Sequence, residues 1–313
     1  MKVVVAGASG LIGGALVPAL VADGHDVVRL VRRKPKKADE VQWDPAGHEV
    51  DDAVIAGADA VINLAGAGIG DRRWTESYKQ QALDSRVDST TTLAAAAAKH
   101  ASSVRVLLNA SAVGWYGDRG DDVVTESDGC GEGFLADLVR QWEAATAPAE
   151  AAGVRVVRIR TGIVLSPEGG ALGRMLPLFR LGVGGRLGSG KQWVPWIAID
   201  DEIAAIRFLL ANDEASGAFN LAAPNPVTNA ELTKALGRAL HRPTVAAVPP
   251  IALRLAFGGF ADEGLLAGQR AVPAALEAAG FGFAHAELEG ALTALLSGSR
   301  GPARTARAKG KRR

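Results

Sequence analysis

Glycines with the spacing of an anion-binding turn occur near the start of the chain, in the stretch KVVVAGASGLIGGALVPALVADGHDVVRLVRR (2–33). Between a strand and a helix, the first glycine of such a pattern permits a tight turn, the second lets the backbone approach a pyrophosphate, and the third permits close helix packing. The N–H groups and the dipole of the helix then favour the anion. The pattern predicts dinucleotide binding rather than a simple turn. The residues predicted to contact the dinucleotide here are Gly7, Ser9, Gly10, Leu11, Ile12 and Gly13.

The second apolar segment, 26–31, ends in basic residues where an NAD site would have an acid. An Asp or Glu at the end of this strand binds the ribose hydroxyls of NAD, whereas basic residues accept the 2′-phosphate of NADP. Asp26 lies at the start of the segment, too early to reach the ribose. Arg32 and Arg33 follow its end, and a planar guanidinium can donate two parallel hydrogen bonds to a phosphate. We therefore expect NADP(H) rather than NAD(H); the alternative is a solvated basic loop.

The elements that must position these residues alternate between strand-like and helical segments. Near-continuous Val, Ile and Leu in the strands is typical of a parallel sheet covered on both faces. Right-handed crossovers then predict an α/β fold with a doubly wound, Rossmann-type sheet. The expected strands are 3–7, 26–31, 59–66, 105–112, 154–165 and 217–222, and the expected helices are 11–22, 50–56, 76–99, 134–152 and 200–212.

The character of the chain changes after residue 165, where Gly- and Pro-rich loops and helices follow, with a further strand possible at 244–248. A chain of 313 residues is long enough for about two domains. We expect an NADP-binding Rossmann domain over 1–165 and about 198–225, and a smaller, mostly helical substrate-side domain over 166–197 and 226–296.

The last residues, 297–313, carry seven basic side chains and no acid. Without them the chain has 28 Lys and Arg against 34 Asp and Glu, a net charge of −6. We expect a disordered, solvated tail; the alternative is contact with nucleic acid or acidic lipid. The rest of the chain has no basic stripe with interleaved aromatics, so we expect no nucleic-acid partner outside this tail.

Composition favours a cytoplasmic protein without a membrane or metal partner. Cys130 is the single cysteine, so no internal disulfide can form. The five histidines are scattered without metal-binding spacing, so no zinc is expected. The apolar runs are too short to span a membrane, and a strand directly after Met1 leaves no room for a signal peptide.

Several motifs resemble the extended short-chain dehydrogenase/reductases over about residues 1–295. These are the glycine spacing, NLAG (63–66), NASAVGWYG (109–117), GSGKQWVPWIAIDDEIAAIRFLL (188–210) and FNLAAPNPVTNAEL (219–232). The segment RRWTESYKQQALDSRVDSTTTL (72–93) and the loop Gln192-Trp193-x-Pro195-Trp196 look like an atypical branch, the NAD(P)-dependent epimerase-family proteins. Residues 246–295 are similar to the small helical domain of the DUF1731 type that accompanies this branch.

The resemblance implies further cofactor contacts. Leu64 and Ala65 should pass under the adenosine and ribose, and Gln81 and Arg86 should face the cofactor from the following helix. For Arg86, a plain surface ion pair is the alternative. A small-molecule substrate is also implied, but its identity and the oligomeric state stay open.

The acid/base pair usual in short-chain dehydrogenases is absent from this sequence. These enzymes use Tyr-x-x-x-Lys on the helix after the fourth strand, where the lysine lowers the tyrosine pKa and the tyrosine transfers a proton. Phe134 and Leu138 stand at those two places. Ser111 matches the serine that would bind a substrate carbonyl, and Tyr116 could be a displaced acid; the alternative for Tyr116 is a packed aromatic. Glu143 should brace its helix against Arg140 or a loop.

Substrate-side residues are harder to assign. Trp193, Pro195 and Trp196 could cover the nicotinamide, although large aromatics also pin loops to a core. Two functions follow from these observations. The first is an NADP(H)-dependent oxidoreductase or epimerase with altered chemistry, and the second is a non-catalytic NADPH-binding sensor or interaction protein. Basic residues that could hold a substrate diphosphate, or could simply be solvated, are Arg160, Arg174, Arg180, Arg186 and Lys191.

Overall fold

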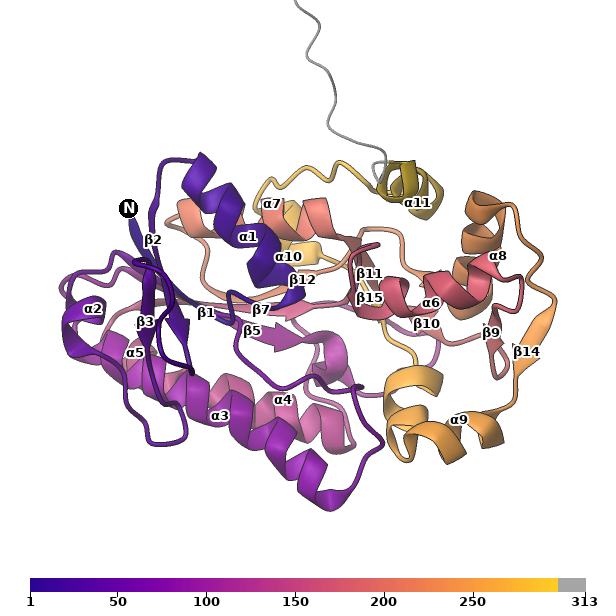
Figure 1. The fold of residues 1–313 in the computed structure, drawn as a ribbon, viewed down its shortest axis with the longest axis horizontal. Coiled ribbons are helices and arrows are strands. Elements are labelled where there is room, and N and C mark those ends of the chain that lie inside the picture. The colour runs from indigo at the N-terminus through magenta and orange to yellow at the C-terminus, as the bar shows by residue number, and fades with distance from the viewer. Residues whose placement is uncertain (298–313) are drawn as a thin grey trace, which may run out of the picture.

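Seven parallel strands form the central sheet of the structure, a computed structural model that describes residues 1–297 (Figure 1). In chain order these strands are β1 (Lys2–Ala6), β2 (Asp26–Val31), β3 (Glu40–Gln42), β4 (Ala60–Asn63), β5 (Val106–Ala112), β7 (Arg155–Thr161) and β12 (Gly217–Leu221). They lie in the order β12-β7-β5-β4-β1-β2-β3. This confirms the predicted doubly wound α/β architecture. The predicted basic tail lies, except for its first residue, outside the described residues.

Helices cover both faces of this sheet, as Figure 1 shows. They are α1 (Leu11–Ala22), α2 (Asp52–Ala56), α3 (Glu76–Lys99), α4 (Phe134–Ala144), α5 (Ala147–Ala151) and α7 (Ile199–Ala211). Val3 of β1 packs in one core with α1 and α7, whereas Val4 packs in a second core with α2, α3 and α5. The alternation along β1 follows from the two-residue period of a strand, which sends successive side chains to opposite faces.

Two predicted elements are each divided in the structure. The predicted helix 134–152 is wrong as a single element, because α4 ends at Ala144 and the short α5, with Pro148 in its first turn, begins at Ala147. The predicted strand 154–165 is also divided, into β7 and β8 (Ile163–Leu165). At the break, a Cβ on Gly162 would lie 2.4 Å from the carbonyl oxygen of Pro195. The segment around Pro195 therefore passes directly over Gly162, and β8 pairs with β11 (Trp196–Ala198) instead of continuing in the main sheet.

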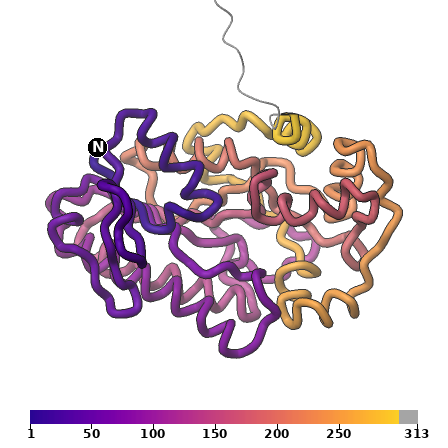
Figure 2. Tube along the Cα trace, in the orientation of Figure 1, coloured from indigo at the N-terminus to yellow at the C-terminus, as the bar shows by residue number. Residues whose placement is uncertain are grey.

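The part formed by residues 170–197, 227–266 and 288–297 lies beyond the carboxyl ends of the main strands, on the right in Figure 2, whereas α7 and β12 belong to the layers of the main sheet. Its own core includes Leu172, Leu176, Leu236 and Leu292. The predicted strand at 244–248 is present as β14 and pairs with β9. The remaining elements are η1 (Val113–Tyr116), β6 (Val123–Val124), α6 (Gly170–Arg180), β9 (Gly185–Leu187), β10 (Trp193–Val194), β11 (Trp196–Ala198), β13 (Val227–Thr228), α8 (Asn229–Leu240), β14 (Ala246–Val248), α9 (Pro250–Phe257), η2 (Ala261–Leu266), β15 (Arg270–Ala271), α10 (Ala274–Ala278) and α11 (Leu288–Ser297).

Within residues 1–297, none of the helices combines the length and apolar character that a membrane span requires. The same residues contain no group of three or more His, Cys, Asp or Glu side chains that could hold a metal ion. Residence in the cytoplasm stays a prediction.

Candidate cofactor and active site

The glycine turn between β1 and α1 has the conformation that its spacing predicts. Gly7 has a φ of +78°, and a Cβ there would lie 2.4 Å from the carbonyl oxygen of Leu64. A Cβ on Gly13 would lie 2.4 Å from the carbonyl oxygen of Gly7. Close packing at Gly13 is therefore against the turn itself, rather than against the sheet as the general pattern suggests. Both positions require glycine for reasons internal to the protein.

Gly10 differs from these two glycines because nothing within residues 1–297 requires it. Its φ of −74° and ψ of 176° are open to any residue, and a Cβ would find only the carbonyl oxygen of Gly7, at an ordinary 3.4 Å. Gly10 is also the N-cap of α1, which has no side-chain cap and no acid in its first turn. By contrast, Asp51, Thr75 and Thr228 cap α2, α3 and α8. The first N–H groups of α1 therefore remain available to an external anion.

The other predicted residues of this turn surround Gly10. Ser9 is exposed, and Leu11 and Ile12 are half-buried at the start of α1. A Cβ on Gly170 would lie 3.0 Å from Cδ2 of Leu11, which shows that the beginning of α6 passes close to the turn.

The two arginines after β2 have different surroundings. Arg32 is exposed and makes no hydrogen bond or ion pair with the described residues. Arg33 donates two parallel hydrogen bonds to Glu40, at 2.8 and 2.9 Å. Arg33 also holds the pKa of the Glu40 carboxyl at about 2, with help from the backbone N–H of Lys36. Glu40 was not predicted from the sequence, since no spacing pattern marks an acid that begins a three-residue strand.

Leu64 and Ala65 follow β4 at the same edge of the sheet as the glycine turn. The backbone N–H of Leu64 donates to the carbonyl of Ala6, at the end of β1 (3.0 Å). The N–H of Ala65 donates to the side chain of Asn63 (3.1 Å), whose amide nitrogen reaches Asn109 in β5 (2.8 Å). The backbone that the resemblance places under the adenosine is thus held by both neighbouring strands.

Of the two α3 residues expected to face the cofactor, Gln81 is exposed and Arg86 is partly enclosed. The Arg86 guanidinium donates to the carbonyl of Ala82 (2.9 Å) and lies 5.1 Å from the ring centroid of Trp142. Among the described residues no carboxylate pairs with it, so the alternative of a surface ion pair is wrong. Burial lowers the pKa of Arg86 to about 10. A guanidinium in this position would gain from an anionic ligand.

Ser111 at the end of β5 is part of a buried ionic network. Its hydroxyl donates to Glu143 of α4 (2.5 Å), and Glu143 accepts two further hydrogen bonds from Arg160 of β7 (2.8 and 3.0 Å). The side chains of Arg160 and Glu143 are only 5% and 8% exposed. The prediction that Glu143 braces its helix against Arg140 is therefore wrong, because Arg140 pairs with Asp137 on the surface. Arg160 is likewise a buried residue, not a solvated one.

Tyr116 extends the same network toward β12. Its hydroxyl donates to the side-chain oxygen of Asn220 (2.7 Å) and accepts from Arg160 (3.2 Å). Tyr116 is fully buried, and this burial raises the pKa of its hydroxyl. The Arg160 guanidinium lies 4.1 Å from the ring centroid of Trp115. This environment fits the packed-aromatic alternative, in which the hydroxyl is hydrogen-bonded inside the protein.

Phe134 and Leu138, at the two places of the missing pair, belong to an apolar cluster. Phe134 meets Trp74 edge-on with ring centroids 5.1 Å apart, and the Phe260 ring centroid lies 5.4 Å from that of Trp74. Glu263, close to Phe260, accepts the backbone N–H of Leu135 in the first turn of α4 (2.8 Å). A side chain from the C-terminal part of the chain therefore caps the helix that carries these positions.

The tryptophans predicted as a possible lid are anchored. Trp196 is fully buried and donates to the carbonyl of Asn225 (3.0 Å). Trp193 donates to Asp121 (2.9 Å) and stacks with Arg270. Both rings pin the loop, in line with the alternative interpretation.

The remaining basic residues of the predicted substrate side have mostly local partners. Arg174 pairs with Asp71 in the loop after β4, and Arg186 donates to two carbonyls of its own loop, those of Gly188 and Ser189. Arg180 offers its carbonyl to Arg242. Arg174 is thus the member of this group that joins the loop after β4 to α6.

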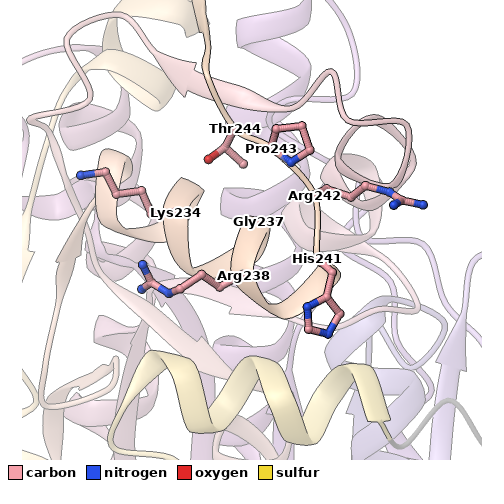
Figure 3. Close-up of a pocket in the computed structure, with 7 residues that line it drawn as sticks. All are labelled: Lys234, Gly237, Arg238, His241, Arg242, Pro243 and Thr244. Carbon is pink, nitrogen blue, oxygen red and sulfur yellow. The ribbon is translucent and has the colours of Figure 1, made fainter.

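A surface hollow of about 620 Å³ lies at the end of α8, away from the glycine turn. Figure 3 shows that its basic side chains diverge, with Lys234 and Arg242 pointing to opposite sides. Arg238 pairs with Glu289, and Arg242 donates to the carbonyl of Arg180 (2.9 Å). The hollow is therefore separate from the candidate site and does not present a convergent anion site.

Comparison with known proteins assigns the chain to a family. Residues 3–222 match the NAD dependent epimerase/dehydratase family. The chain belongs to this family. Residues 248–295 match DUF1731, a domain of unknown function, so both parts of the resemblance seen in the sequence are confirmed.

Relatives of this epimerase-family chain match over nearly its whole length. An epimerase family protein of Mycobacterium bovis is 53% identical over 283 residues, which cover 90% of this chain and 93% of the relative. A chloroplastic SDR39U1 homolog of Arabidopsis thaliana is 36% identical over 312 residues, 95% of this chain and 87% of the relative. The structure of human epimerase family protein SDR39U1 with NADPH has a TM-score of 0.87 and 34% identity, covering 95% of this chain and 99% of the human one.

Proposed function

We propose that this epimerase-family protein binds NADP(H) at the turn between β1 and α1 and acts as an oxidoreductase or epimerase on a small carbonyl or sugar-like substrate. The observation that carries the proposal is Gly10. It is a glycine that neither backbone conformation nor packing requires, at the open N-terminus of α1. A ligand that approaches the backbone closely supplies the missing reason. The human relative, whose structure holds NADPH, supports the same ligand.

The residues present fit such a cofactor. The free N–H groups of α1 would face its pyrophosphate, and the unpaired Arg32 would meet the 2′-phosphate. Glu40, the acid nearest to Arg33, accepts hydrogen bonds on both oxygens, and its side chain is only 2% exposed, so ribose hydroxyls would have little access to it. When bound, the cofactor supplies hydride transfer at its nicotinamide ring. These contacts favour NADP(H) over NAD(H).

Ser111 and Tyr116 remain the proposed proton-handling residues, although both hydroxyls are engaged in the buried network. For either one to protonate a substrate oxygen, its present hydrogen bond would have to be exchanged for one to the substrate. The buried network would slow such an exchange, because Glu143 accepts the Ser111 hydrogen bond and Arg160 donates to the Tyr116 hydroxyl.

A second function is a cofactor-binding protein without catalysis. The specific observation in its favour is the pair Phe134 and Leu138, which carries no ionisable group where a tyrosine and a lysine usually act. In this case NADPH occupancy would control stability or an interaction surface.

The experiment that tests the proposed function has two stages. Titration of the protein with NADPH and NADH should show tighter binding of NADPH, and Arg32→Ala should weaken NADPH binding about tenfold while leaving NADH binding unchanged. Equal binding of both by the unaltered protein would contradict the cofactor preference. NADPH oxidation in a screen of aldehydes, ketones and quinones would then favour catalysis; tight binding without turnover would favour the sensor.

A further inference from the structure

We propose that Glu40 is a positioning residue for the 2′-phosphate of the cofactor. By occupying one edge of the Arg33 guanidinium, Glu40 would hold the other edge ready for the phosphate. The inference rests on the proposed NADP(H) site and names a residue that acts there without touching the ligand.

Glu40 is built into the sheet and is held by several donors. Its side chain is 2% exposed, and it begins β3, which pairs with β2 so that Glu40 lies opposite Arg29. One oxygen accepts from Arg33 Nη1 and from the backbone N–H of Lys36, both at 2.8 Å. The other accepts from Arg33 Nη2 (2.9 Å) and lies 3.3 Å from Arg29 Nη2. The carboxylate is therefore a fixed anchor at the end of a rigid element.

The hydrogen bonds of Arg33 use only one of its two donor edges. Nη1 donates to Glu40 and to the carbonyl of Lys34, and Nη2 donates once to Glu40. The N–H of Nε and the second N–H of Nη2 have no partner among the residues that the structure describes. These two N–H groups lie on one edge of the guanidinium and are parallel, which is the arrangement that matches two oxygens of a phosphate.

The surroundings of Arg33 explain why such an anchor matters. The connection 32–39 (RRKPKKAD) carries five basic residues and one acid, and the Arg33 side chain is 49% exposed. Without an anchor, the Arg33 side chain would be repelled by the neighbouring basic residues and would sample many rotamers. Binding a phosphate would then restrict those rotamers and cost conformational entropy. Arg32 has no such anchor in the part of the chain that the structure describes, and it would contribute mainly its charge.

Glu40→Gln tests the proposal, because glutamine keeps the shape but loses the charge and one acceptor oxygen. The full-length protein is titrated with NADPH and NADH at one ionic strength. We expect the Kd for NADPH to rise about fivefold to tenfold and the Kd for NADH to change by less than about twofold. Asp39→Asn is the matched control, since Asp39 is the neighbouring acid and pairs only with Arg29; its NADPH affinity should stay within about twofold.

Tighter or unchanged NADPH binding by Glu40→Gln would overturn the proposal, because Glu40 would then only neutralise Arg33. Equal affinity of the unaltered protein for both cofactors would instead reject the proposed function itself. If Glu40→Gln loses NADH binding and its folded state, Arg33→Lys decides: lysine keeps the charge and a bond to Glu40 but has no second edge. We expect this variant to lose NADPH affinity nearly as much as Arg33→Ala, and full retention would contradict the anchor.

Discussion

Two parts of one sheet edge treat their polar groups in opposite ways. At the β1–α1 turn and after β2, the N–H groups of the first turn of α1 and the Arg32 guanidinium have no partner within residues 1–297. At the ends of β5 and β7, Ser111 and Arg160 both bind Glu143 of α4, and Tyr116 joins this network through Arg160. The first part, which we call the open half, offers unused donors. The second, the closed half, uses its polar groups internally.

The difference teaches which part of an enzyme-like site this chain retains. Unused donors at a surface are readily solvated and become useful when an anion arrives. Buried charges, in contrast, require partners, and a complete set of partners leaves little capacity for a substrate. Ligand binding should therefore depend on the open half, and folding stability should depend on the closed half.

The largest effect is expected from Glu143→Ala in the closed half. The change leaves the Arg160 guanidinium buried without its carboxylate, and the loss of one partner of a buried ion pair destabilises a protein by about 3–5 kcal/mol. Denaturant unfolding measures this effect. Asp137→Ala, on the same helix, removes a surface partner of Arg140 and should change stability by less than about 0.5 kcal/mol. Similar values for the two variants would show that the closed half is not a stabilising network.

A second effect concerns pH and Glu202, a fully buried residue of α7 that accepts a hydrogen bond from Thr161 at the end of β7 (2.9 Å). Burial raises the pKa of Glu202 from 4.5 to about 8. Between these values the unfolded chain loses a proton that the folded protein keeps, so stability falls as pH rises. The contribution is complete below about pH 4.5 and is lost by about pH 8.

Glu202→Gln should remove this slope, which amounts to on the order of 3 kcal/mol between pH 5 and 8. Thermal unfolding at several pH values checks the prediction. Asp200→Asn, in the same helical turn but 71% exposed, is the control and should leave the slope in place. A slope that persists in Glu202→Gln would assign the pH dependence to other groups.

Gly10→Ala tests the open half. The added Cβ meets no protein atom closer than 3.4 Å, so the thermal stability without cofactor should be unchanged or slightly higher. NADPH affinity should fall by roughly 10- to 100-fold, equivalent to about 1.4–2.8 kcal/mol. Gly13→Ala provides the contrast, because its Cβ would lie 2.4 Å from the carbonyl oxygen of Gly7 and should destabilise the fold itself. Normal NADPH binding by Gly10→Ala would remove the main support for the cofactor site.

The smallest effect is expected from Tyr116→Phe. Removing the hydroxyl leaves Asn220 without a donor and Arg160 without one acceptor, which should lower stability by about 1–2 kcal/mol. NADPH binding should not change.

If an activity is found in the screen, its loss in both Tyr116→Phe and Ser111→Ala, with the fold intact, would support the catalytic assignment. If both variants keep the activity, residues other than Tyr116 and Ser111 must transfer the proton.

Local signals explain why much of the fold was predictable from the sequence. The predicted helices 11–22 and 76–99 agree with α1 and α3, whose starts are marked by Gly10 and by the capping residue Thr75. The apolar strands of the main sheet were also located, because a parallel strand buried on both faces is a run of Val, Ile and Leu. Where the local pattern was interrupted by a distant contact, as at Gly162, the prediction was wrong.

Partners distant in sequence explain what could not be predicted at the site. Glu143 and Arg160 belong to different elements, and no spacing rule links a helix residue to a strand residue of the next unit. Glu40 and Arg33 are only seven positions apart, but their contact depends on the return of the chain from β2 to β3. The open half is encoded by a contiguous motif, whereas the closed half is encoded by its tertiary contacts.

The cap that Glu263 places on α4 has a consequence for how the protein is made. The two partners, Leu135 and Glu263, are 128 positions apart, and Glu263 belongs to the segment that matches DUF1731. During synthesis from the amino terminus, α4 leaves the ribosome long before its cap has been translated. Until the carboxyl-terminal segment has emerged, the first turn of α4 would lack this side-chain partner, so the segment contributes to the end of a helix made 128 positions earlier.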